Sequence, residues 1–318
     1  RDIDDDLLKS ALGKDISGYG EMGYVNIYTE KTLRIHEDSS YSYSIRYIRG
    51  ITSESGRKAG TVKHYYKNND EDIEINFART VTEEGRILNL KEIAIEDASV
   101  YSRVPSYDNL HERKFAMREA KPGNILDFKV TITGKIGDSS PRIFDVILGD
   151  EGPTMEASFK VIVPRSFALS WQQWRVDEPD IERIDGTKIL RWKIEDVPPL
   201  FQENNKPPQE YIMPRVVAGL SDRWERCADV FREHLGSQYE TEAKTEKGIY
   251  EEVLKMVRFV DIPSHACSSY PEGTGEIVSG RLANSLDKAV LLFQAYRASG
   301  FPAELILVRS KGRGVLAD

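Results

Sequence analysis

The side chains best suited to nucleophilic chemistry lie toward the end of the chain. Cys267 follows His265 by two positions, and Ser285 directly precedes an apolar helical pattern over residues 286–299. A thiol or hydroxyl attacks a carbonyl carbon when a neighbouring base accepts its proton. Loop residues two positions apart seldom bring their side chains together, so we interpret His265 and Cys267 as part of a loop that lines a groove. Ser285 equally suits the N-cap of the helix, and Asn284 is the alternative cap.

Two tryptophans suggest a different chemistry, the stacking of aromatic rings on sugars. Trp171 and Trp174 lie three residues apart in a segment with strand character. Residues at odd spacing on a strand point to opposite faces, so a joint sugar platform is not expected. A carbohydrate-binding module is therefore kept only as an alternative.

Metal and cofactor chemistry has little support in the sequence. The five histidines are scattered, and no two have the i, i+4 spacing of a helical metal site. Two cysteines are too few for an all-cysteine zinc site; Cys227 and Cys267 form either one disulfide or two free thiols. We predict no metal and no cofactor.

The secondary-structure elements that would position these residues divide the chain into two parts. The first part is rich in predicted strands. Tyr41, Tyr43, Ile45 and Tyr47 alternate with polar residues, as in a half-buried strand. Turn residues at Gly85 and at 185–186 indicate tight hairpins. Many short strands at regular spacing predict an antiparallel β-sandwich domain over residues 1–217.

The second part of the chain is rich in predicted helices. Apolar residues recur at three- and four-residue spacing over 222–235, 247–259 and 286–299. Glycines at positions 236 and 300 are suited to end the first and third of these helices. The predicted fold class is therefore α+β, with a mainly helical second domain over residues 218–318.

The last helix resembles the catalytic-helix segment of bacterial transglutaminase-like proteins, which have a papain-like core. In that family a Gly-Asp-Cys-Lys-Asp-Lys-Ala run opens the helix; here residues 287–289, 291–292 and 297–303 match the family pattern. The preceding β-rich part, with its hairpin over 78–85, resembles the domain of unknown function DUF3857, which commonly precedes such a core. The resemblance implies a DUF3857 domain followed by a transglutaminase-like core.

Two departures from the family pattern bear on activity. The family's nucleophilic cysteine aligns with Ser285, and its Gly-Asp aligns with Ala283-Asn284. The chain ends at Asp318, so the family's later catalytic His and Asp have no counterpart. A helix N-terminus and a nearby imidazolium stabilise a thiolate, whereas a serine hydroxyl needs a general base within reach. We expect a partial core without its catalytic cysteine, in which Ser285 occupies the nucleophile position and is inactive.

Composition limits the partners. The 318 residues carry a formal net charge of −8 without a basic block, which disfavours nucleic-acid binding. The most apolar stretch, 289–308, is interrupted by Arg297 and Glu304, so we expect no transmembrane segment. The sequence predicts a non-catalytic, periplasmic or extracellular protein of the bacterial cell envelope that binds or scaffolds a protein or polymer. The main alternative is an active transglutaminase- or cysteine-protease-like enzyme whose His and Asp lie beyond this chain.

Overall fold

The computed structural model describes residues 5–136, 143–200, 209–220, 232, 235, 239–263 and 271–306. Their contacts divide the chain into two compact units. Unit 1 comprises residues 1–66, 70–97 and 112–222, and unit 2 comprises 67–69, 98–111 and 223–318. Each unit is described by itself.

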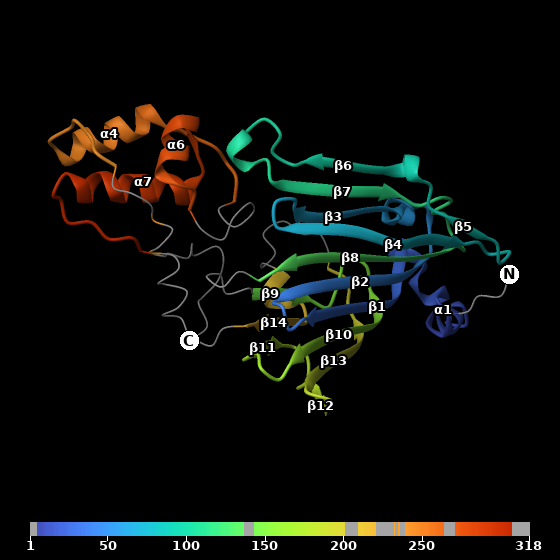
Figure 1. Ribbon diagram of the computed structural model, residues 1–318. Helices are drawn as coiled ribbons and strands as arrows, with labels where there is room; N and C mark the ends of the chain where they lie inside the picture. Colours follow the sequence, from blue (N-terminus) through green and yellow to red (C-terminus); the bar gives the residue numbers. More distant parts are fainter. Residues whose placement is uncertain are drawn as a thin grey trace. The chain divides into compact units, whose positions relative to one another are not determined.

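Unit 1 is built on one large sheet, which has eight strands in the described ranges (Figure 1). Its strand order is β12 (Asp180–Ile184), β13 (Thr187–Val197), β10 (Thr154–Pro164), β1 (Tyr24–Ile35), β2 (Ser40–Ile51), β8 (Ile125–Lys135), β4 (Glu71–Val81) and β5 (Ile87–Asn89). The predicted period-two strand around Tyr43 is β2. The two predicted hairpin turns are also present: Gly85 has a φ of 77°, and Asp185 and Gly186 have φ of 45° and 76° between β12 and β13.

Two smaller sheets cover one face of the large sheet. The β9 sheet has the order β11 (Ser170–Trp174), β14 (Arg215–Gly219) and β9 (Ile143–Ile147); the β3 sheet has the order β3 (Thr61–Lys67), β7 (Leu110–Ala116) and β6 (Ile95–Ser99). On β2, Tyr41 packs in the core under the β9 sheet, and Ile51 in the core under the β3 sheet. Both are odd-numbered, so the two cores lie on the same face of the large sheet.

Helix α1 (Asp6–Leu12) packs on part of the opposite face of the large sheet. The even-numbered Ile48 of β2 packs there against Leu8 and Ala11. Beside this core, the buried carboxylate of Asp127 pairs with the guanidinium groups of Arg46 and Arg79, at 3.0 and 2.7 Å. Short 3-10 helices, η1 (Ser17–Met22), η2 (Glu54–Gly60) and η3 (Glu92–Ala94), and the short helix α2 (Gln209–Ile212) connect the strands.

Unit 2 contains three helices within the described ranges. It also contains residues 67–69 and 98–111 of the β-rich part, which we call its tip. The helices are α4 (Glu246–Met256), α6 (Thr274–Gly280) and α7 (Ser285–Ala298), and the strands β15 (Arg258–Phe259) and β16 (Leu282–Ala283) pair in parallel. The tip contributes η4 (Pro105–Tyr107). Apolar residues of all three helices form one core, which contains Ile249, Ile277 and Leu291.

The predicted fold class is wrong. Among the described residues 43% are in strands and 23% in helices, so the protein is mostly β, and a mainly helical C-terminal core is not supported. The helices α4, α6 and α7 are short, and extended segments and the strands β15 and β16 separate them. The helix predicted over 222–235 lies almost wholly outside the described residues. The large sheet is also not purely antiparallel, because β1 and β10 pair in parallel.

Candidate functional site

The start of helix α7 is the position to which the sequence assigned chemistry. Ser285 is the first helical residue and its side chain is exposed, so it is not the N-cap that we predicted. The cap is the alternative, Asn284, whose Oδ1 accepts a hydrogen bond from the backbone N–H of Asp287 at 3.0 Å. The amide oxygen of Asn284 reaches a position in the first turn that N-cap side chains commonly satisfy.

Asp287 is the buried centre of this site, with 1% of its surface exposed. The hydroxyl of Tyr107 donates to its Oδ2, and the backbone N–H of Glu272 donates to its Oδ1 at 2.9 Å. The same tyrosine oxygen accepts a hydrogen bond from the backbone N–H of Asn284 at 2.9 Å. Tyr107 belongs to η4, so the tip of the β-rich part fixes the first turn of α7.

The site is rich in carboxyl groups. Burial raises the pKa of Asp287, although the hydrogen bonds from Tyr107 and from the N–H of Glu272 oppose this. Burial, a hydrogen bond with Glu276 and the charge of Asp287 raise the pKa of Glu272 to about 7. Burial and the hydrogen bond to Asp287 raise the pKa of Tyr107. These groups oppose the formation of a further negative charge at the start of α7.

The apolar residues of α7 predict a buried side that consists of Ala289, Leu292, Phe293 and Tyr296. In the structure Ala289 is exposed and the other three are half-buried. The fully buried residues of the helix are Asp287, Val290, Leu291, Gln294 and Ala295. The polar members of this face are held by partners from other segments, as Thr274 holds Gln294. Sequence periodicity could not show those partners.

The other sequence candidates do not add to this site. His265 and Cys267 lie outside the described residues, as does Cys227. Within the part of the chain that the structure describes, no group of three or more His, Cys, Asp or Glu side chains could hold a metal ion. In the same part, no helix is long and apolar enough to cross a membrane.

The two tryptophans do not form a sugar platform. Trp171 packs against the core of unit 1, edge-on to Trp192 at 6.3 Å between ring centroids. Trp174 instead lies under the guanidinium of Arg215, 5.0 Å from its ring centroid. The rings serve two separate environments, as their odd spacing on β11 predicts.

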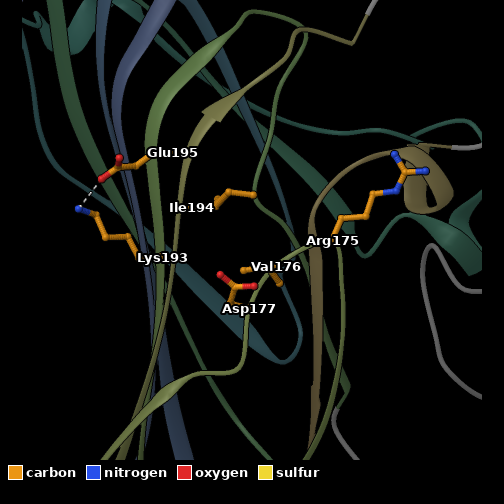
Figure 2. Close-up of a pocket in the computed structure, with 6 residues that line it drawn as sticks. All are labelled: Arg175, Val176, Asp177, Lys193, Ile194 and Glu195. Atoms are coloured by element: carbon orange, nitrogen blue, oxygen red, sulfur yellow. Dashed lines mark hydrogen bonds and ion pairs between the residues drawn. The ribbon is translucent and has the colours of Figure 1, made fainter.

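Unit 1 also contains a pocket of about 520 Å³, which no sequence motif indicated. Its walls come from residues Arg175, Val176, Asp177, Lys193, Ile194 and Glu195 (Figure 2). Lys193 forms ion pairs with Glu195 and Glu156, at 2.9 and 3.3 Å. Figure 2 shows the guanidinium of Arg175 pointing away from the Lys193–Glu195 pair; it donates to the carbonyl of Ile212 at 3.0 Å. Arg175, Lys193 and Glu195 are thus engaged with the protein itself, and none of the six lining residues is a serine, threonine, cysteine or histidine.

Comparison with known proteins identifies the β-rich part. The family model for DUF3857, described as a domain of unknown function with a solved structure, matches residues 37–201. No curated protein matches the sequence.

Solved structures show the fold of a larger part of the chain. A "putative protease" from Parabacteroides distasonis superposes with a TM-score of 0.78 at 17% identity, over 87% of this chain and 59% of that one. The chain thus spans about three fifths of that protein, and at this identity the similarity shows the fold alone. An M1 zinc metallopeptidase mutant from Deinococcus radiodurans aligns with 61% of this chain and 42% of its own, at 10% identity, but its TM-score of 0.33 is too low to support an argument.

Proposed function

We propose that this chain, which belongs to the DUF3857 family, is a non-catalytic protein of the bacterial cell envelope that binds or scaffolds a protein or polymer partner. We further propose that the segment around helix α7 is related to transglutaminase-like proteins and has lost the nucleophile of that family.

The observation that carries the proposal is Ser285 at the first position of α7. The resemblance places a cysteine there, and a serine needs more help to ionise. A helix N-terminus favours negative charge by about 0.3–1 kcal/mol, rarely about 2 kcal/mol. One pKa unit corresponds to about 1.36 kcal/mol, so the terminus lowers a pKa by about one unit. That is enough for a thiol but negligible for an alcohol.

The surroundings of Ser285 support the same conclusion. Its hydroxyl makes no hydrogen bond to another side chain among the described residues, so no base is in place in that part of the chain. The buried carboxyl group of Asp287 already occupies the first turn of α7. The raised pKa values of Asp287 and Glu272 indicate a site that disfavours additional negative charge.

A binding role is supported by the edge of the large sheet. β12 is the last strand at one end of that sheet, and all five of its residues are exposed, with Ile181 and Ile184 at 39% and 50%. Edge strands present backbone groups to which an extended segment of a partner can add. A periplasmic or extracellular location is proposed from the resemblance to bacterial transglutaminase-like proteins alone.

A second function is favoured by one observation, the fold shared with the Parabacteroides distasonis protein that is described as a putative protease. Because this chain covers 59% of that structure, a longer protein containing it could supply a histidine and an aspartate. In that case the segment would belong to an active enzyme of the cysteine-protease or transglutaminase type.

Amine incorporation distinguishes the two functions. The chain, any longer protein that contains it, and the variants Ser285→Cys and Ser285→Ala are incubated with a fluorescent alkylamine and casein, and separately with peptidase substrates. We expect no turnover from any of them. Turnover by Ser285→Cys that is absent from Ser285→Ala would establish that the remaining catalytic groups are present and would support the enzyme.

A further inference from the structure

The two outermost strands at one end of the large sheet differ in length. β12 pairs with β13 only as far as the pair Asp180–Arg191, whereas β13 continues to Val197. No strand of the described ranges pairs with residues 192–197 on the β12 side. This stretch of β13 is therefore an open edge of the sheet, about 20 Å long at about 3.3 Å per residue.

The turn between β12 and β13 determines which backbone groups face the open edge. Its two residues have φ of 45° and 76°, as in a two-residue type I′ turn, so Ile184 and Thr187 beside it form a hydrogen-bonded pair. Because hydrogen-bonded pairs alternate with non-hydrogen-bonded ones, the odd-numbered residues of β13 direct their N–H and C=O groups away from β10. The backbone groups of Lys193 and Glu195 thus point out of the sheet, and they have no partner among the described residues.

The pocket of about 520 Å³ lies beside these backbone groups. On β13 it contacts three successive residues, Lys193, Ile194 and Glu195, whereas a pocket on one face of a strand would contact alternate residues. Residues 175–177, which follow β11, form its other wall (Figure 2). An extended chain that enters this space continues the line of β12.

The two faces of the open edge have different side chains. Figure 2 shows Ile194 on the side of Val176, and Lys193 and Glu195 on the other side of the strand. Residues directly opposite each other on paired strands share a face. An added strand would therefore meet apolar side chains on one face and charged side chains on the other.

Carboxylates predominate around the pocket. Lys193 lies between Glu195 and Glu156, so two carboxylates share one ammonium group. Asp177 forms no ion pair within the described part of the chain. The guanidinium of Arg175 donates to a backbone carbonyl and points away from the Lys193–Glu195 pair (Figure 2). A segment with a basic residue therefore complements this edge, and an acidic segment does not.

We infer that the open edge of β13 binds an extended segment of a partner protein, in which apolar residues alternate with polar ones that include a basic residue. This rests on the proposed binding role, for which it specifies the partner and the place. The polar residues of the segment lie opposite Lys193 and Glu195 and form the backbone hydrogen bonds. A polysaccharide lacks the alternating N–H and C=O groups that this edge complements.

A short peptide is the probe, Ac-Thr-Val-Lys-Val-Thr-Val-NH2 with a fluorescent label. Its binding is measured by fluorescence anisotropy at pH 7. One comparison peptide is N-methylated at the polar residues, whose N–H groups should face β13, and another is N-methylated at the valines, whose N–H groups should point away. A further peptide has glutamate in place of the lysine.

Two pairs of protein variants accompany the peptides. Lys193→Pro removes the N–H that faces the pocket, and proline is tolerated on an edge where the N–H points off the sheet. Lys193→Ala is its matched control, because it loses the same side chain and keeps the N–H. Asp177→Lys reverses a charge of the pocket, and Glu74→Lys reverses an exposed charge on β4 as its control. Thermal unfolding shows whether each variant is folded.

We expect the protein to bind the probe and the valine-methylated peptide with the same affinity. Methylation of the polar residues should weaken binding at least tenfold, and the change to glutamate should weaken it severalfold. Lys193→Pro should weaken binding of the probe at least tenfold and Asp177→Lys severalfold. Lys193→Ala and Glu74→Lys should bind it at least as tightly as the parent protein does.

Absence of probe binding overturns the inference. Equal binding of the two N-methylated peptides also overturns it, because attraction by charge alone would then be sufficient, and so does unchanged binding to a folded Lys193→Pro protein. If Lys193→Pro does not fold, the two methylated peptides decide on the parent protein. Failure of the non-catalytic proposal is measured separately as turnover, so absence of both probe binding and turnover would contradict this inference alone.

Discussion

Replacing Tyr107 by phenylalanine removes one oxygen atom on which the first turn of α7 depends. That oxygen donates to the buried carboxyl of Asp287 and accepts the backbone N–H of Asn284 at 2.9 Å. The phenyl ring keeps its packing with Ile262 and its neighbours. The change therefore removes these two hydrogen bonds and keeps the packing of the ring.

Both losses leave buried polar groups without partners. A hydrogen bond to a charged group contributes about 1.5–3 kcal/mol, and an unsatisfied buried donor costs about 1–3 kcal/mol. Because the two terms share one atom and are not additive, we expect Tyr107→Phe to lower the local stability of α7 by about 3 kcal/mol. Each 1.36 kcal/mol is a factor of ten, so the most protected amides of α7 should exchange roughly a hundredfold faster.

The measurement is native-state hydrogen exchange of the α7 peptides, read by mass spectrometry. Tyr250→Phe is the matched control, because Tyr250 lies on α4 of the same unit and is 47% exposed. The hydrogen bond from Tyr107 lowers the pKa of Asp287, so the loss should be larger at pH 8 than at pH 5. Exchange in Tyr107→Phe as slow as in the Tyr250→Phe control would refute the role given to this hydroxyl.

Three further predictions concern other parts of the structure. Between pH 4.5 and about 7 folded Glu272 holds a proton that the unfolded chain has released, so stability falls as pH rises through this window. Glu272→Gln should reduce that fall in urea titrations, with Asp287 contributing the remainder because its pKa is also raised, whereas the exposed Glu251→Gln should leave the fall unchanged. Asp127→Ala removes the buried one of the two carboxylates that Arg46 and Arg79 share, while Asp5 still pairs with both, and should destabilise unit 1 by about 1–3 kcal/mol, read from tryptophan fluorescence; a loss under about 0.5 kcal/mol would contradict the buried pairing. Asn284→Ala should lower the free energy of unfolding by about 1 kcal/mol because Asn284 caps α7, whereas Ser285→Ala should change it by less than about 0.5 kcal/mol. A larger loss from Ser285→Ala than from Asn284→Ala would show that Ser285 is the N-cap instead.

Local patterns in the sequence predicted the strands and turns well. Alternation around Tyr43 identified β2, and Gly85 and Gly186 marked turns that need a positive φ. The parallel pairing of β1 with β10 was not predictable, because it joins segments such as Leu33 and Val161 that are far apart in the chain. Nothing in a local pattern specifies such a partner.

In the candidate site, too, the local structure was predicted from the sequence and the long-range contacts were not. The bounds of α7 were predicted within one residue, 286–299 against Ser285–Ala298, but its buried face was not. Asp287 is buried only because Tyr107 and the N–H of Glu272 satisfy it.

The measurement that most directly tests the non-catalytic proposal is covalent labelling of Ser285. The chain is incubated with a fluorophosphonate probe beside Ser285→Ala, and the peptide containing position 285 is analysed by mass spectrometry. We predict no probe adduct at Ser285, because neither the helix terminus nor a base among the described residues activates its hydroxyl. Stoichiometric labelling at Ser285 that is absent from Ser285→Ala would contradict it.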